Sequence, residues 1–315
     1  MTASRESGGE HVVQPPLPPN HQHKRSRREA LELYSARVPF RLKLVVVWAV
    51  ILGVLVALFA AASFDTAWMR ENAGFIARGI TWTIVIAILA IALACVLALL
   101  GALGRLSRNA IAVGVTSFYT SFFRGTPLIV QLFLIYLALP QIGIALGDPW
   151  ADLLTLDVLT AGVIALGLNY GAYMTEIFRA GIQSVGHGQS EAAEALGMTY
   201  LQKMRRVVLP QGFRVIIPPT GNEFIAMMKD TALVSFLGTS IDQMEIFRRA
   251  QLLGRADFRN LEALLVAALM YWGLTTIFQY FQLRLEHRLS KGYVRGTARV
   301  AVAGQREPAA TTRET

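Results

Sequence analysis

Long apolar runs without charged side chains alternate with short polar segments along most of the chain. Residues 44–62 and 80–103 contain no Asp, Glu, Lys or Arg, and each matches the roughly 20 residues that an α-helix needs to cross about 30 Å of hydrocarbon. Four further apolar regions follow at 110–139, 159–182, 213–237 and 263–281, and the stretch FRGTP interrupts the first of these four. The pattern predicts an all-α, polytopic membrane protein with about six transmembrane helices.

Polar segments lie at both ends of this pattern. Residues 1–41 contain the stretches QPPLPPN and HKRSRRE, a composition typical of a disordered, basic tail. The first apolar segment, at 42–65, is too long for the core of a cleaved signal peptide, so we expect it to remain as an N-terminal span. We expect residues 287–315 to form a second, disordered tail.

The distribution of Lys and Arg predicts which ends of the helices face the cytoplasm. With six spans, four groups of positive charges fall on one side, which we take as cytoplasmic: residues 24–41, 105–108, 203–206 and 284–299. The segment 140–156 contains two aspartates and no Lys or Arg, so it fits the outside. Segment 239–261 disagrees, because it is predicted to be external yet carries four arginines, and we expect it to contact an external partner. Both termini are therefore predicted to be cytoplasmic.

Composition narrows the class of protein further. Hydrophobic residues make up 54% of the 315 residues and charged ones 16%, below the roughly 25% of an average soluble domain. The net charge of +9 does not indicate nucleic-acid binding, because the basic residues flank apolar runs instead of forming one patch. A single cysteine, Cys95, excludes an internal disulfide framework, and none of the five histidines lies in an apolar run. We therefore expect no metal site.

One polar stretch, EAAEALGMTYLQKMRRVVLP at 191–210, interrupts the apolar pattern. Residues 191–196 are strong helix formers, and Gly197 is suited to end that helix. Residues 200–208 again have a helical pattern, and Pro210 is placed to start the next segment. The stretch predicts two short helices that meet at a corner on the cytoplasmic surface.

This stretch resembles the EAA motif of type-I ABC importer permeases. The matching residues are Glu191, Ala192, Ala193, Gly197, Val207, Leu209 and Pro210, with Val207 where isoleucine is commoner. In that family the motif forms a coupling helix that docks in a cleft of a cytoplasmic ATPase. The resemblance implies the same role for residues 186–211.

Three further stretches are similar to the subfamily that takes up polar amino acids such as histidine, arginine, glutamine, glutamate and cystine. They are FRGTPLIVQLF, LGLNYGAYMTEIFRAGIQSV and LPQGFRVIIPPTGNEFIAMMKDTALVSFLG. The resemblance covers about residues 78–286 and implies a core of five helices, so that 42–65 is an additional span. It places the protein in a bacterial plasma membrane, in contact with lipid. It implies three protein partners: a dimer of ATPase subunits, a second permease subunit that is a copy or a relative, and an extracytoplasmic amino-acid-binding protein.

The chain lacks the motif that ATP hydrolysis would require. No Lys is followed by Ser or Thr, so the phosphate-binding pattern GxxxxGK[ST] is absent. We therefore expect this chain to be a transport subunit without catalytic residues or bound cofactor, and ATP and Mg²⁺ to bind in the partner ATPase.

Polar residues inside the predicted spans are candidates for the solute pathway. Asn169, Tyr173 and Glu176 follow an i, i+4, i+7 pattern and share a helix face. Asn222 and Lys229 are seven residues apart, as are Glu223 and Asp230, and each pair also shares a face. Nearby Pro218, Pro219 and Gly221 predict a kink or break that frees backbone groups.

Two interpretations of these polar residues remain open. In the functional one, Glu176 meets an α-ammonium or cationic side chain, and Lys229 or a free backbone N–H meets the α-carboxylate. In the structural one, Glu176 pairs with Arg179, and Lys229 neutralises Asp230 or Glu223.

A different class of transporter is the alternative function. A carrier of a small polar solute, driven by an ion gradient, would also use intramembrane acids and a broken helix. It would leave the motif at 191–210 unexplained. A membrane-bound enzyme is excluded, because the sequence offers neither a metal cluster nor a nucleophile with a matching base.

Overall fold

The computed structural model describes residues 39–61 and 63–289, and all regular secondary structure in these ranges is helical. The chain divides into two compact units, with the boundary between Phe64 and Asp65. In the first unit, α2 (Phe40–Ala61) corresponds to the predicted N-terminal span. Most of the two predicted tails lies outside the described residues.

Within the described residues, five segments are long and apolar enough to cross a membrane. They are α2, the pair α3 (Thr66–Ala77) and α4 (Gly79–Arg105), α6 (Leu128–Leu146), α8 (Val158–Gln183) and α13 (Asn260–Leu289). Another helix, α11 (Leu209–Asp230), has 22 residues and is about 33 Å long. Its charged residues make it too polar to be recognised by composition, so the number six stays a prediction.

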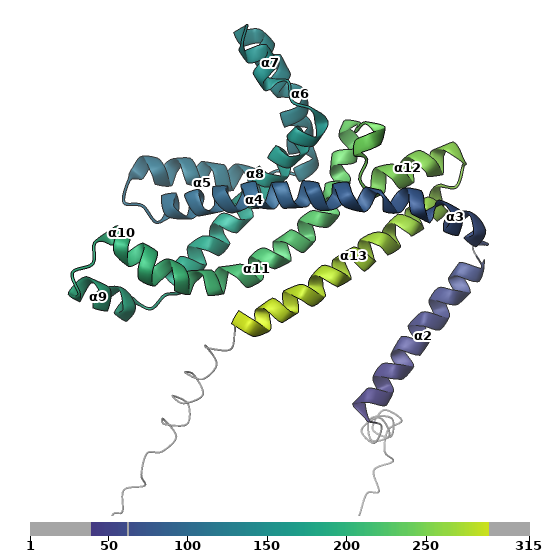
Figure 1. Cartoon of the computed structure of the whole chain (residues 1–315), viewed down its shortest axis with the longest axis horizontal. Coiled ribbons are helices and arrows are strands. Elements are labelled where there is room, and N and C mark those ends of the chain that lie inside the picture. The colour runs from purple at the N-terminus through teal and green to yellow at the C-terminus, as the bar shows by residue number, and fades with distance from the viewer. Residues whose placement is uncertain (1–38, 62, 290–315) are drawn as a thin grey trace, which may run out of the picture. The chain divides into compact units, whose positions relative to one another are not determined.

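Small residues allow close packing at the centre of the second unit, where α4 lies against α8 (Figure 1). Ala90, Ala94 and Ala98 of α4 are fully buried. A Cβ on Gly167 of α8 would meet the side chain of Leu93 at 2.6 Å, and one on Gly171 would meet Leu97 at 3.0 Å. The two helices therefore approach through small residues, as membrane helices commonly do.

The third apolar region, 110–139, consists of two helices that are separated at the predicted interruption, FRGTP. Helix α5 (Ala110–Gly125) ends where Thr126 turns extended, with φ −118° and ψ 147°, and α6 begins at Leu128. The reason is Pro127, whose ring disfavours a helical conformation in the preceding residue. A short helix, α7 (Trp150–Leu154), follows α6.

A kink or break was predicted near Pro218 and Pro219; no break is present, since α11 continues through both prolines, and the kink stays a prediction. The regular helix ends only at Asp230, where a 3₁₀ segment, η2 (Thr231–Leu237), takes over. The predicted fifth span, 213–237, is therefore part of α11 followed by η2. A second 3₁₀ turn, η3 (Ile241–Gln243), and helix α12 (Ile246–Ala256) then lead to α13.

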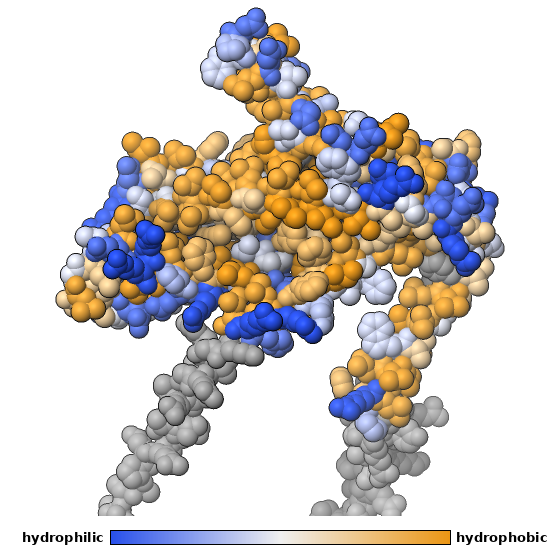
Figure 2. Space-filling model, in the orientation of Figure 1, coloured by the Kyte–Doolittle hydropathy of each residue, from blue (hydrophilic) through white to orange (hydrophobic). Residues whose placement is uncertain are grey.

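Charged and apolar side chains separate on the surface of the second unit. Figure 2 shows apolar side chains over its broad middle, with hydrophilic ones gathered near α9 and α10 at one end and near α3 and α12 at the other. This distribution suits a bundle whose middle lies in hydrocarbon and whose two ends meet water.

Candidate functional site

The stretch 191–210 folds as the predicted corner of two short helices. Helix α9 (His187–Ala195) ends in a Schellman motif, in which Gly197 N–H donates to Glu194 O at 2.9 Å and Met198 N–H donates to Ala193 O at 3.1 Å. Gly197 has φ +74°, a left-handed conformation that favours glycine. The spacing of Gly197 after the predicted helix therefore anticipated the turn correctly.

Polar contacts close the corner on its other side. The Thr199 side chain and the Gln202 side chain form a capping box at the start of α10 (Tyr200–Lys203). Lys203 Nζ lies 2.5 Å from Glu194 Oε1, and this contact lowers the pKa of the Glu194 carboxyl. A π-helical turn, η1 (Met204–Val208), joins α10 to α11. Leu209 and Pro210 consequently form the first turn of α11.

The corner presents an exposed face that mixes motif residues with apolar side chains. Glu191 and Ala192 are exposed, whereas Ala193 is buried beneath them. Leu196, Tyr200 and Leu201 are 78%, 65% and 74% exposed, and we call these three the corner patch. The sequence interpretation did not single out the corner patch, although three large apolar residues in a polar stretch are a usable signal.

A basic cavity of about 570 Å³ lies between α4, α5 and α8. Arg105, Arg124, Tyr173 and Glu176 line it together with small hydroxyl residues. Glu176 Oε1 lies 3.2 Å from Arg105 Nη2, and Glu176 Oε2 lies 2.8 Å from Arg179 Nη2. The pairing of Glu176 with Arg179 required by the structural interpretation therefore forms, and the positive charges around the cavity outnumber the negative.

An acidic cavity of about 390 Å³ lies next along α8. Its lining includes Asn169, Tyr170, Tyr173, Glu223 and Asp230, with no Lys or Arg. The Tyr170 hydroxyl donates to Asp230 Oδ2 at 2.8 Å. Among the described residues no ion pair involves Glu223 or Asp230, so two carboxylates face this cavity without a cation.

The predicted faces of α8 and α11 agree with this geometry. Tyr173 lines both cavities, Asn169 only the acidic one and Glu176 only the basic one. Glu223 and Asp230 share the acidic cavity, as their spacing predicted. Asn222 and Lys229 are exposed and line neither of these cavities, so their place in a solute pathway stays a prediction.

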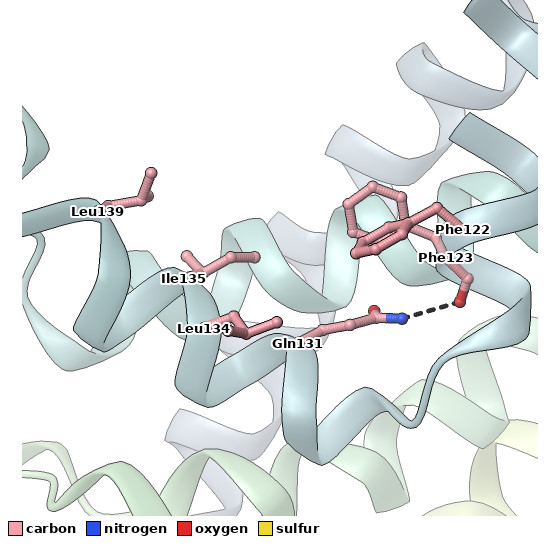
Figure 3. Close-up of a pocket in the computed structure, with 6 residues that line it drawn as sticks. All are labelled: Phe122, Phe123, Gln131, Leu134, Ile135 and Leu139. Carbon is pink, nitrogen blue, oxygen red and sulfur yellow. Dashed lines mark hydrogen bonds between the residues drawn. The ribbon is translucent and has the colours of Figure 1, made fainter. Parts of the chain in front are cut away.

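A buried amide pair at the joint between α5 and α6 was not anticipated from the sequence. Gln131 is 1% exposed, and its Nε2 donates to Phe123 O at 2.9 Å and to Thr126 O at 3.0 Å. Asn169 Nδ2 donates to Phe123 O at 3.1 Å and to Gln131 Oε1 at 3.0 Å. Figure 3 shows Gln131 pointing to Phe123 beside an apolar pocket lined by Phe122, Phe123, Gln131, Leu134, Ile135 and Leu139.

Comparison with known proteins gives the same assignment for most of the second unit. A family model described as "Binding-protein-dependent transport system inner membrane component" matches residues 94–291, which include the corner and all lining residues of both cavities. The probable amino-acid ABC transporter permease protein PatM of Vibrio harveyi is 38% identical over 232 residues, which cover 74% of this chain and 99% of that protein. The arginine transport system permease protein ArtQ of Bacillus subtilis (strain 168) is 37% identical over 215 residues, covering 68% and 92%.

Solved structures agree in fold. The crystal structure of an amino acid ABC transporter with histidines matches with a TM-score of 0.63 and 36% identity, and covers 72% of this chain and 99% of that one. An inward-facing MetNI methionine ABC transporter matches with a TM-score of 0.56 at 18% identity, covering 70% and 98%, which supports the fold alone.

Proposed function

Because the chain belongs to the family of binding-protein-dependent transport system inner membrane components, we propose that it carries a polar amino acid inward as the permease subunit of an ABC importer. It is a multi-pass protein of the inner membrane, and its relatives are permeases of amino-acid transporters. The alternative of a carrier driven by an ion gradient does not fit this family. Both termini are proposed to lie in the cytoplasm.

The corner at 191–210 is the observation that carries this function. Its Schellman turn fixes the direction of α9 relative to α10, and the three large side chains of the corner patch are 65–78% exposed. Such a surface favours a protein partner with a complementary cleft. We infer that this partner is an ATPase subunit, one for each of two permease subunits, and that it binds the ATP and Mg²⁺.

The two cavities of the proposed solute pathway have opposite charges. An amino acid has a carboxylate and an ammonium group, and the arginines of the basic cavity suit the first. Glu223 and Asp230 of the acidic cavity suit the ammonium group or a cationic side chain. Glu176 then orients Arg105 and Arg179, a role that differs from direct contact with the ammonium group. Asn222 and Lys229 are proposed to act at the edge of this path.

Energy for transport comes from the partner chains in this proposal. An extracytoplasmic amino-acid-binding protein delivers the solute to the outer end of the bundle. ATP binding moves the two ATPase subunits, and the corner transmits that movement to α8 and α11, between which it lies in the chain. The permease contributes different affinities for the solute in its two states and breaks no bond.

Reconstitution into liposomes tests the function. The chain would be combined with its ATPase and binding protein, and uptake of each polar amino acid would be measured with and without ATP. We expect ATP-dependent uptake of at least one amino acid, and a KM raised about tenfold or more by Asp230→Asn, because a hydrogen bond to a charged group contributes about 1.5–3 kcal/mol.

Glu176→Gln should weaken the same uptake, and Lys229→Met should show whether Lys229 contributes. Uptake driven by an ion gradient without the ATPase would contradict the proposal.

A further inference from the structure

The joint between α5 and α6 separates the two cavities. Arg124 and Gly125, on the α5 side of the joint, line the basic cavity. Thr126, Pro127 and Leu128, the next three residues, line the acidic cavity. The backbone from Arg124 to Leu128 therefore lies on the boundary between the two cavities, which also adjoin at Tyr173 of α8.

The chemistry of Pro127 explains why the joint needs side chains to hold it. In a continuous helix, the carbonyl of Phe123 would accept a hydrogen bond from the N–H of residue 127, which proline lacks. The amide groups of Gln131 and Asn169 donate to this carbonyl instead, at 2.9 and 3.1 Å. Because Asn169 belongs to α8, this bond ties the joint to a helix that lines both cavities.

Gln131 holds the joint from its other side as well. Its Nε2 donates to Thr126 O at 3.0 Å and lies 2.6 Å from Thr126 Oγ1, while its Oε1 accepts from Asn169 at 3.0 Å. Gln131 is 1% and Asn169 7% exposed, so water cannot readily replace these bonds. The two side chains act as one unit, since each loses a partner when the other is removed.

Space for movement lies beside this unit. An apolar cavity of about 200 Å³ adjoins Gln131 and is lined by the Phe122 and Phe123 rings (Figure 3). This pocket opens to the surface, because two of its lining residues, Phe122 and Leu134, are 40% and 50% exposed. The joint thus has buried polar bonds on one side and an open apolar pocket on the other.

We propose that Gln131 and Asn169 form a latch that keeps the α5–α6 joint closed between the cavities, and that its release opens the passage for the solute. The inference rests on the proposed function, because it assumes that the solute moves through both cavities. Gln131 and Asn169 are positioning residues here, since they act through the backbone of the joint.

Variants of the latch test the proposal in the reconstituted complex. Gln131→Leu and Asn169→Leu remove the amide groups and keep similar volumes. The readout is ATP-independent movement of the transported amino acid down its gradient through the complete complex. We expect this leak to rise at least about tenfold above wild type, and ATP-driven accumulation to fall accordingly. The double variant should leak no more than the stronger single variant.

Thr175→Val is the matched control. Thr175 is fully buried on α8, its hydroxyl donates only within that helix, to Gly171 O at 2.8 Å, and it does not contact the joint. A general loosening of α8 would make this variant leak too, whereas the latch predicts a wild-type leak.

A milder variant covers the case in which the leucine variants fail to fold. Thr126→Val removes one contact of Gln131 and should give a smaller but measurable leak. Folded latch variants with normal accumulation and no leak would overturn the proposal, as would an equal leak in Thr175→Val. If wild type shows no ATP-driven uptake at all, the proposed function fails, which is a result distinct from failure of the latch.

Discussion

At the residue scale, the proposed coupling to the ATPase depends on the backbone conformation of Gly197. Its φ of +74° is a conformation that other L-residues adopt at a cost of about 1 kcal/mol. We expect Gly197→Ala to weaken the Schellman turn by about this amount. The direction of α9 would then vary, and solute-stimulated ATPase activity of the assembled transporter should fall several-fold.

Gly186→Ala is the matched control for this prediction. Gly186 precedes α9 and has an ordinary φ of −56°, and a Cβ there would meet no atom within 4 Å. ATPase stimulation should stay at the wild-type level. If Gly197→Ala also couples normally, the turn does not transmit movement.

Residue spacing predicted some contacts and could not predict others. Local helical periodicity was enough to predict the turn at Gly197 and the ion pair between Glu176 and Arg179. The structure has both of them. Gln131 and Asn169 are 38 residues apart, and only the packing of α6 on α8 brings them together. The sequence pattern identified Asn169 as polar within a span but gave no sign of its partner.

At the element scale, prolines show how local chemistry and packing compete. Pro127 ends a helix, because it favours an extended conformation in Thr126 before it. Pro218 and Pro219 do not break α11, which is held between α8 and α13. Gln282 of α13 donates to Pro218 O at 2.6 Å, so the neighbouring helix supports the region. Propensity alone could not distinguish these two outcomes.

Helix α12, outside the spanning helices, depends on one buried carboxylate. Glu245 caps the helix by accepting from Phe247 N–H at 2.7 Å and Arg248 N–H at 2.6 Å, and it also contacts the hydroxyls of Ser235 and Tyr271. Burial raises the pKa of the Glu245 carboxyl above its usual range, and these hydrogen bonds offset the effect in part. The Glu245 carboxyl therefore binds a proton more tightly in the folded protein than in the unfolded chain.

The pKa shift of Glu245 predicts how stability depends on pH. The contribution of the protonated group is fully present below the unfolded pKa of about 4.3, and it declines as pH rises through the higher folded pKa. Thermal unfolding of the purified protein between pH 4 and pH 8 should show this loss, and Glu245→Gln should reduce it. Asp242→Asn, which changes an exposed acid of the same loop, is the control. An unchanged pH profile in Glu245→Gln would contradict the assignment.

At the scale of the whole molecule, the patterns of charge and hydropathy were enough to predict the class of protein. The apolar runs identified an all-helical membrane protein, and the family match agrees with the motif at 191–210. Helix α11 escapes recognition by composition because four of its residues, Arg214, Glu223, Lys229 and Asp230, are charged. Two of these four line the acidic cavity, so the polarity that hides the helix is the feature proposed to serve transport.

Labelling of single cysteines tests the central claim most directly, since the corner at 191–210 must lie in the cytoplasm to receive movement from an ATPase. Cys95 is the only cysteine, so Cys95→Ala gives a background for Leu196→Cys, at 78% exposed, and for Phe258→Cys, at 92% exposed in the predicted outer loop. With a membrane-impermeant maleimide, we predict that Leu196→Cys reacts in inverted vesicles and not in intact cells, and that the ATPase subunit protects it. Phe258→Cys should react in intact cells. Reaction of Leu196→Cys from the outside of intact cells would contradict the account.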